Sequence, residues 1–199
     1  MGQPEDAAST VEEAEERRLI DRSAAGDQEA FRQLVLRYHR MVINVAFRAL
    51  GELSLAEDVA QDVFIKVYKA LPGYRHEKPF KHWLHRVAAN AATDVLRRRR
   101  PVVSLDGLEQ PPAATGSDPQ DVAARHDLQR AVRNAIANLP SHYRDTIALQ
   151  AFAELSYDEI SRVLDIPIGT VMSRLNGAKR LLRERLGDLV HPAEEANTA

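Results

Sequence analysis

The chain has 199 residues, of which 44% are hydrophobic and 28% are charged, and its formal net charge is −2. It contains no cysteine, which excludes disulfides, thiolate catalysis and cysteine-based zinc sites. No apolar run approaches the ~20 residues that a membrane helix requires, and the acidic N-terminus lacks the basic start and apolar core of a signal peptide. We therefore expect a cytoplasmic protein without membrane insertion.

Residues 1–13 are rich in acidic side chains and are predicted to form a disordered acidic tail. A short helix is expected over about 14–25. Asp27 then provides a good N-cap for an amphipathic helix that runs to Leu50 and ends at Gly51.

Two more helices are expected before residue 100. Ser54 and Glu57 have the spacing of a capping box, which predicts a helix from Ser54 to about Ala70. Another helix should run from about Pro79 to Arg100. Residues 14–100 are thus predicted to form a compact all-α domain.

Residues 101–118 combine prolines, glycines and acids without a positive charge and are predicted to be a linker. Because such a segment buries no core, we expect the domains on its two sides to move independently. Residues 119–187 are predicted to form a second all-α domain, with helix caps at Asp118 and Ser141, and residues 188–199 a polar tail.

The second domain ends in a predicted helix-turn-helix. Ser156 and Glu159 have the spacing of a capping box for its first helix, the residues 165–167 break that helix before a proline, and a second helix begins around Ile168. The fold class is therefore all-α, with two helical domains joined by a flexible linker and the second ending in a helix-turn-helix.

The second helix of this motif has an apolar stripe on one side and polar groups on the other. The stripe comprises Val171, Leu175, Ala178 and Leu182, and the other side comprises Ser173, Asn176, Gly177 and Arg180 with Thr170 and Arg174 on its flank. Such a helix suits the DNA major groove. The alternative is an ordinary surface helix with a solvated basic face, but the capped first helix and the short turn favour DNA binding.

Several stretches together resemble one protein family. Residues 139–186 (LPSHYRDT…RLLRERL) are similar to the −35-element-binding domain of bacterial sigma-70-type RNA polymerase sigma factors. Three stretches, AAGDQEAFRQLVLRYHRMVINVAFRAL, AEDVAQDVFIKVYKAL and FKHWLHRVAANAATDVLRRRR, resemble the core-binding and −10-element domain of the same family. The resemblance covers roughly residues 14–187, and the short linker points to the extracytoplasmic-function (ECF) subgroup.

The resemblance implies that the chain binds core RNA polymerase, both the clamp helices of the β′ subunit and the β subunit. The helix of residues 54–70 matches the family's docking helix at Asp58, Gln61, Asp62, Phe64 and Lys66. The alternative for any one of these positions is a solvated helix surface that binds nothing.

The stretch of residues 74–100 interleaves aromatic and basic side chains, a combination that suits single-stranded DNA. The resemblance implies that it captures a flipped base of the −10 element, with contacts from Tyr74, Phe80, Lys81, His82, Asn90, Asp94, Arg97 and Arg98. Two alternatives stay open. Trp83 shares a stripe with Leu84 and Val87 and fits a core position, and arginines at a helix C-terminus also suit the helix dipole.

For the −35 element the resemblance implies contacts from Thr170, Ser173, Arg174, Asn176, Lys179 and Arg180. The recognition helix departs from the usual pattern, because Met172 and Gly177 stand where many members carry basic residues. This departure affects which −35 sequence is read more than whether DNA is bound.

Catalytic and metal sites are not expected. His82 and His85 are three residues apart, but no third ligand has suitable spacing, and no nucleophile–base pair, P-loop or dinucleotide motif is present. We expect no cofactor and no enzymatic activity. The expected partners are core polymerase, promoter DNA and a separate anti-sigma protein, since the chain shows no sensing element of its own.

Two other classes of function fit the sequence less well. A conventional dimeric repressor would need a dimerisation surface and a ligand or receiver domain, and a nucleic-acid enzyme would need an acidic or metal constellation. Stable co-purification with core polymerase would distinguish a sigma factor from a repressor.

Overall fold

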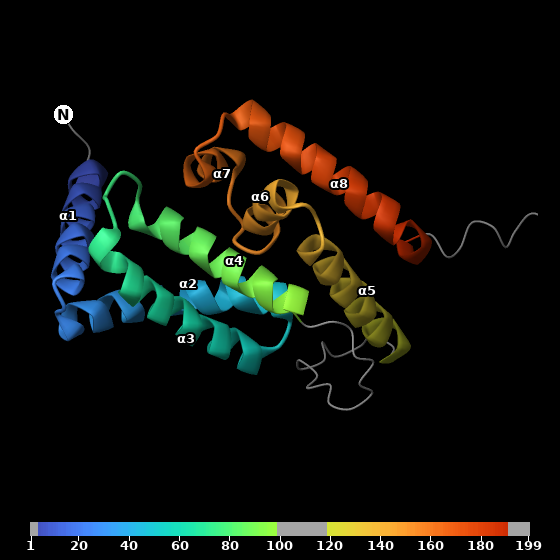
Figure 1. The fold of residues 1–199 in the computed structure, drawn as a ribbon, viewed down its shortest axis with the longest axis horizontal. Coiled ribbons are helices and arrows are strands. Elements are labelled where there is room, and N and C mark those ends of the chain that lie inside the picture. Colours follow the sequence, from blue (N-terminus) through green and yellow to red (C-terminus); the bar gives the residue numbers. More distant parts are fainter. Residues whose placement is uncertain (1–3, 99–118, 191–199) are drawn as a thin grey trace, which may run out of the picture.

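The computed structural model describes the backbone of residues 4–98 and 119–190, and the side chains of residues 12–98 and 125–187. Within these ranges the chain forms eight α-helices and one 3-10 helix and no strand, which confirms the all-α class (Figure 1). The predicted linker, the Asp118 cap and the end of the polar tail lie outside the described residues.

The first domain consists of four α-helices. They are α1 (Pro4–Ala24), α2 (Gln28–Leu50), α3 (Leu53–Ala70) and α4 (Phe80–Arg98), with the 3-10 helix η1 (Leu71–Gly73) after α3. Helix α2 packs against the other three α-helices. The predicted disordered tail is wrong from Pro4 onward, because the alanines and glutamates of this stretch favour a helix.

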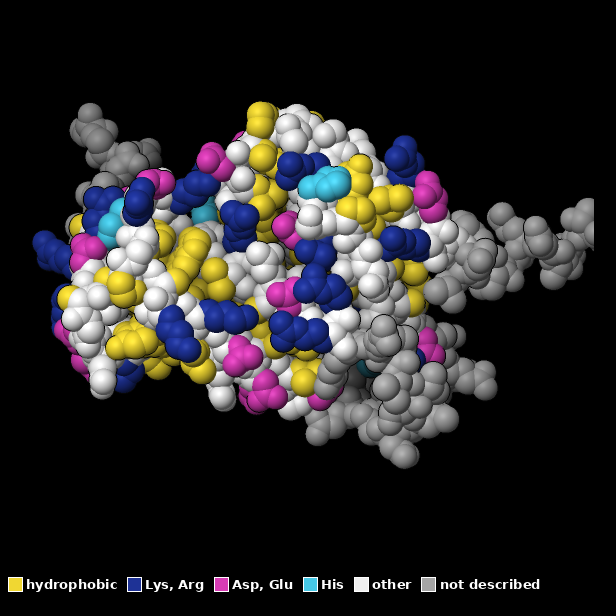
Figure 2. All heavy atoms as spheres, viewed as in Figure 1, with side chains coloured by type: hydrophobic (Ala, Val, Ile, Leu, Met, Phe, Trp, Pro, Cys, Tyr) yellow, Lys and Arg dark blue, Asp and Glu magenta, His cyan; other side chains and the backbone are white. Residues whose placement is uncertain are grey.

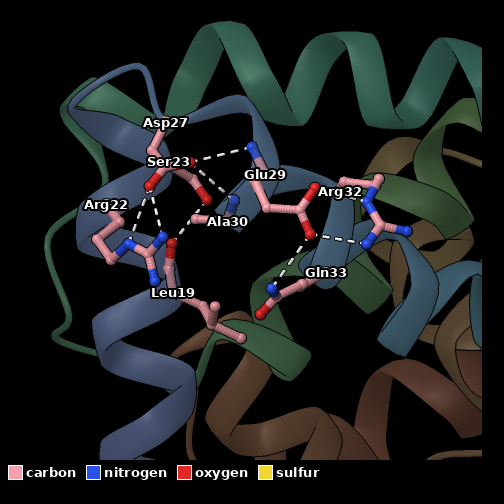
Figure 3. Close-up of polar contacts among 8 residues, drawn as sticks. All are labelled: Leu19, Arg22, Ser23, Asp27, Glu29, Ala30, Arg32 and Gln33. Atoms are coloured by element: carbon pink, nitrogen blue, oxygen red, sulfur yellow. Dashed lines mark hydrogen bonds and ion pairs between the residues drawn. The ribbon is translucent and has the colours of Figure 1, made fainter.

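The corner between α1 and α2 is fixed by the predicted cap (Figure 3). Asp27 Oδ1 accepts hydrogen bonds of 3.0 Å from the backbone N–H groups of Glu29 and Ala30. Arg22 donates to Asp27 Oδ2 at 2.6 Å from the preceding helix. The N–H of Ala30, followed by the Arg22 hydrogen bond, lowers the pKa of Asp27, so the carboxylate form is the one that caps α2.

Two of the other predicted caps are displaced, by two residues at Ser54 and by one at Ser141. Helix α3 begins at Leu53, so Ser54 lies inside the helix and its hydroxyl donates to Glu52 Oε1 at 2.9 Å. Helix α6 begins at Ser141 itself, with Pro140 at the N-cap position. By contrast, Gly51 ends α2 as predicted, with the left-handed φ of 75° that glycine adopts without strain.

The second domain contains α5 (Pro119–Ala137), α6 (Ser141–Ala151), α7 (Tyr157–Leu164) and α8 (Ile168–Val190). Helices α7 and α8 form the predicted helix-turn-helix. The capping box is formed in both directions: the Ser156 hydroxyl accepts from the Glu159 N–H at 3.3 Å, and Glu159 accepts from the Ser156 N–H at 2.8 Å. Asp165, with φ of 59°, ends α7.

The two domains pack against each other through α4. This helix contacts α2 and α3 on one side and α5, α6 and α7 on the other (Figure 1). At 100° per residue its buried residues span an arc of about 220°, about twice what one packed face requires. They are Phe80, Leu84, His85, Ala88, Ala89, Ala91, Ala92, Thr93 and Leu96. The sequence predicted domains that move independently; in this arrangement α4 packs them together, and their independent motion stays a prediction.

Candidate polymerase and nucleic-acid interfaces

One face of α3 displays the polar residues that were predicted to bind polymerase. Asp58, Gln61, Asp62 and Lys66 are all exposed, while Val59, Val63 and Val67 face the core. Phe64 is a correction. Its side chain is only 8% exposed and its ring lies 6.3 Å from that of His39 on α2, so it packs the interior.

Ile65 belongs to the same exposed face and was missed in the sequence. Its side chain is 53% exposed, between Asp62 and Lys66 in the chain. A bulky apolar residue surrounded by polar ones is typical of the centre of a protein interface. The available signal was its phase, because Ile65 falls off the buried stripe of α3.

The loop after α3 forms a hollow that we call the Tyr74 pocket. It has a volume of about 400 Å³ and is lined by Ala70, Gly73, Tyr74, Arg75, Glu77, Lys78, Trp83, Arg86 and, from α7, Val163. The rings of Tyr74 and Trp83 lie 5.3 Å apart. Tyr74 donates a hydrogen bond of 2.5 Å to the Lys78 carbonyl, which closes the loop. Burial raises the pKa of Tyr74 to about 12, so its hydroxyl stays protonated.

The pocket combines aromatic rings with three cations, the groups that hold unstacked bases and phosphates. Arg75, Lys78 and Arg86 were not among the predicted contacts. Arg75 and Lys78 lie in the loop between η1 and α4, and Arg86 lies within α4. All three belong to the stretch of residues 74–100 whose aromatic and basic side chains were the available signal. Trp83 both packs against the core and lines the pocket, so the core alternative for this residue is partly right.

The predicted −10 residues do not form one surface. Lys81, Arg97 and Arg98 are exposed, whereas His82, Asn90 and Asp94 are half-buried, and Tyr74 lines the pocket. Phe80 is a correction: it is 2% exposed and its ring packs 5.5 Å from that of Tyr38. It therefore supports the Tyr74 pocket from the core and offers no face to a base.

Two histidines of α4 lie close to the boundary with the second domain. Burial, followed by repulsion from Arg162 on α7, lowers the pKa of His82. Burial and nearby Lys81 lower the pKa of His85 to about 4. In the described part of the chain, the Nδ1 atom of neither histidine has a hydrogen-bond partner. Both rings are therefore uncharged near neutral pH.

Helix α8 lies on the outer side of the second domain, where it packs on α5, α6 and α7 (Figure 1). Ser173, Asn176 and Arg180 are exposed, as predicted for DNA contact, and Thr170, Arg174 and Lys179 are half-buried. Met172 is 46% exposed on the same helix. Figure 2 shows Lys and Arg side chains spread over both domains, including the boundary between them.

Gly177 does not belong to the exposed face of α8, contrary to the sequence prediction. A Cβ atom at this position would lie 2.6 Å from the Tyr143 ring of α6. Gly177 therefore allows α8 to approach α6 closely. Of the two positions at which the resemblance implied basic residues, Met172 is the exposed one.

Family comparisons agree with this two-part arrangement. Residues 34–102 match Sigma-70 region 2, which covers most of α2, α3 and α4. Residues 129–182 match Sigma-70 region 4, which covers the end of α5 and the helix-turn-helix.

Curated relatives match along most of the chain. The ECF RNA polymerase sigma factor SigW of Bacillus subtilis is 32% identical over 87% of this chain and 97% of its own length. The RNA polymerase sigma-H factor of Pseudomonas aeruginosa is 33% identical over 90% of this chain and 97% of its own. The ECF RNA polymerase sigma-E factor of Escherichia coli K12 is 34% identical over 86% of this chain and 94% of its own length.

A solved structure shares the fold. CnrH, in complex with the cytosolic domain of CnrY, aligns with a TM-score of 0.55 and 28% identity over 87% of this chain and 97% of that one. Among the described residues, no helix is long and apolar enough to span a membrane. From its two matched regions and its full-length relatives, the chain belongs to the ECF family of RNA polymerase sigma factors.

Proposed function

We propose that this chain directs core RNA polymerase to promoters, with α3 as the polymerase contact, the Tyr74 pocket as the −10 site and α8 as the −35 reader. The observation that carries the proposal is the placement of two separate exposed polar faces, on α3 and on α8, in the two matched sigma regions. Catalysis then belongs to the polymerase, and the chain works beside it in the cytoplasm.

The exposed face of α3 suits a protein partner. Asp58, Gln61 and Asp62 offer acceptors and donors for the β′ clamp helices, and Ile65 offers an apolar centre. An interface gains most of its affinity from such a central residue once a polar rim excludes water. Contacts to the β subunit would come from elsewhere on the chain.

The Tyr74 pocket suits an unstacked base of the −10 strand. Tyr74 and Trp83 supply aromatic surface, and Arg75, Lys78 and Arg86 supply charge for the adjacent phosphates. The exposed Arg97 and Arg98 at the far end of α4 extend this positive charge along the helix.

Helix α8 suits the major groove at the −35 element. Ser173 and Asn176 present a hydroxyl and an amide, and Arg174, Lys179 and Arg180 present cations that can contact guanine edges or phosphates. Among the described residues, the helix packs on α5, α6 and α7 of its own domain.

We further propose control by a separate anti-sigma protein. The solved structure of CnrH contains the cytosolic domain of CnrY as a second chain. In this chain, the exposed Ile65 and its acidic neighbours offer a surface for which such a protein would compete with polymerase.

Run-off transcription with core polymerase, followed by mapping of start sites, tests the main proposal. We expect Arg174→Ala to weaken −35 duplex binding by about 1–3 kcal/mol while core binding is kept. Asp62→Ala should weaken core polymerase binding and leave −35 duplex binding intact. Arg183→Ala on α8 and Glu57→Ala on α3 are exposed control variants that should change neither activity.

Equal loss of both activities from either test variant would contradict the assigned roles. A chain that does not co-purify with core polymerase, but binds duplex DNA as a dimer, would instead be a repressor.

A further inference from the structure

The second domain contributes to the wall of the Tyr74 pocket. Val163 of α7 lines the pocket together with Tyr74 and Trp83 of the first domain. Arg162, also on α7, is near enough to His82 of α4 to lower the pKa of that histidine. A DNA strand that entered this site would therefore meet α7.

A group of contacts around Arg48, which we call the Arg48 cluster, joins the two domains. The Arg48 guanidinium at the end of α2 pairs with Glu154 at 2.6 Å and donates to the Phe152 carbonyl at 3.3 Å. Arg133 of α5 donates to the Arg48 carbonyl at 3.0 Å. The first domain thus contacts both α5 and the segment between α6 and α7.

Two backbone features of the cluster suggest that the contact is built into the fold. Glu154 has φ of 55°, a left-handed conformation that is strained for a residue with a side chain. Gly51, at the end of α2, leaves room for Arg133: a Cβ atom there would lie 2.2 Å from the Arg133 Nη1 atom. A second ion pair, Lys78–Asp165 at 3.4 Å, joins the pocket loop to the end of α7.

The two proposed DNA sites differ in their exposure in this arrangement. Helix α4 is covered on its second side by α5, α6 and α7, whereas Ser173, Asn176 and Arg180 on α8 remain exposed. In this state the −35 face is exposed, whereas Val163 of α7 forms part of the wall of the −10 pocket.

We propose that the second domain is an intramolecular lid over the Tyr74 pocket, held by the Arg48 cluster, and that the chain must open before a −10 strand can bind. This inference rests on the proposed function, because it concerns the regulation of the same −10 site. Opening separates α7 from α4 and exposes the pocket, while each domain keeps its own core.

The first test measures opening in the full chain. Because the chain has no cysteine, single cysteines can be introduced at the exposed Glu57 of α3 and Arg183 of α8 and labelled for energy transfer. Glu154→Gly removes the Arg48 ion pair and also relieves the left-handed strain, so it should not unfold the second domain. Glu29→Gln removes an ion pair of 2.7 Å with Arg32 inside the first domain and is the matched control.

We expect a high-transfer closed state in the unmodified chain. Because the Arg48–Glu154 pair is partly exposed, Glu154→Gly should raise the ratio of open to closed chain by about two- to five-fold. Arg48→Glu should open the chain further, and Arg48→Glu combined with Glu154→Arg should restore part of the closure. Glu29→Gln should leave the ratio unchanged.

The second test measures access to the pocket. Trp83 is the chain's single tryptophan and lines the pocket with Val163, so acrylamide quenching of its fluorescence reports uncovering. A random-sequence single strand of 12 nucleotides (about the span of a short single-strand site) serves as the −10 probe. Random-sequence duplex DNA serves as the probe for α8. Glu154→Gly should increase quenching, raise single-strand affinity by the factor by which the open fraction rises, and leave duplex affinity unchanged.

Two results would overturn the lid. One is a transfer efficiency that Glu154→Gly and Arg48→Glu do not change. The other is an opened variant whose single-strand affinity equals that of the unmodified chain. Failure of the proposed function has a separate signature, since run-off transcription with core polymerase would then be absent whether the chain is open or closed.

Discussion

The contact between Gly177 and Tyr143 gives a prediction whose sign depends on a second residue. In a solvent-exposed helix interior, Gly→Ala stabilises by about 1 kcal/mol. At Gly177, however, the new Cβ would lie 2.6 Å from Tyr143 Cε1 and 2.9 Å from Cζ, so the ring or α8 must move. Overpacking of this kind costs about 1–3 kcal/mol. We expect Gly177→Ala to lower the free energy of unfolding by up to about 2 kcal/mol.

The double-mutant cycle isolates that steric contribution. In a Tyr143→Ala background the ring is gone, and Gly177→Ala should now stabilise the chain by about 1 kcal/mol. The coupling energy should therefore be about 1–3 kcal/mol. Urea unfolding followed by far-ultraviolet circular dichroism measures it, because the single tryptophan lies in the first domain and does not report on α8. The packing argument is refuted if Gly177→Ala stabilises both backgrounds equally.

Two further predictions concern pH and base reading. Because the pKa of buried His85 is lowered from 6.5 to about 4, neutral His85 contributes its full stability above pH 6.5, and about 3 kcal/mol of that stability is lost as the pH falls toward 4. The difference in unfolding free energy between the unmodified chain and His85→Leu should change by this amount across the range. A difference that stays constant with pH would contradict the prediction. Exposed Met172 is expected to contact a thymine methyl group of the −35 element. Replacing thymine by deoxyuridine in the mapped −35 duplex should then weaken binding about three- to five-fold for the unmodified chain and for the α5 control Leu128→Ala, but not for Met172→Ala. Equal sensitivity of all three chains would exclude Met172 as the residue that contacts the methyl group.

Local sequence patterns predicted structure well where both interacting residues lie close together in the sequence. Ser156 and Glu159 are three residues apart, and the capping box that they form needs nothing else. The same pattern at Ser54 and Glu57 failed, because the spacing does not specify which residue begins the helix, and α3 begins at Leu53.

Positions that depend on distant partners were predicted poorly. Phe64 and Phe80 were assigned to interfaces, but His39 and Tyr38 of α2 pack against them, and nothing near either phenylalanine in the sequence indicates this. The exposure of Ser173, Asn176 and Arg180 on α8 was predicted correctly, because one helix's periodicity separates its two sides. Even there, Gly177 was misplaced, since Tyr143 lies on another helix.

The packing of the domains was missed although α4 carries a signal for it. The alanine-rich stretch from Ala88 to Ala92 makes the apolar arc of α4 too wide for a helix covered on one side. A composition-based interpretation of the linker took priority over this pattern, and the linker itself lies outside the described residues.

The alanine-rich side of α4 also makes the arrangement of the domains sensitive to temperature. Separating the domains would expose apolar surface of α4 that α5, α6 and α7 now cover, and exposure of apolar surface raises the heat capacity. Hydrophobic contact weakens on cooling, whereas an ion pair such as Arg48–Glu154 depends on charge and is weakened by salt. Cold and high salt should therefore loosen the same boundary by separate routes, and a cell that is chilled or salt-stressed would change the accessibility of α4 without any change in the sequence.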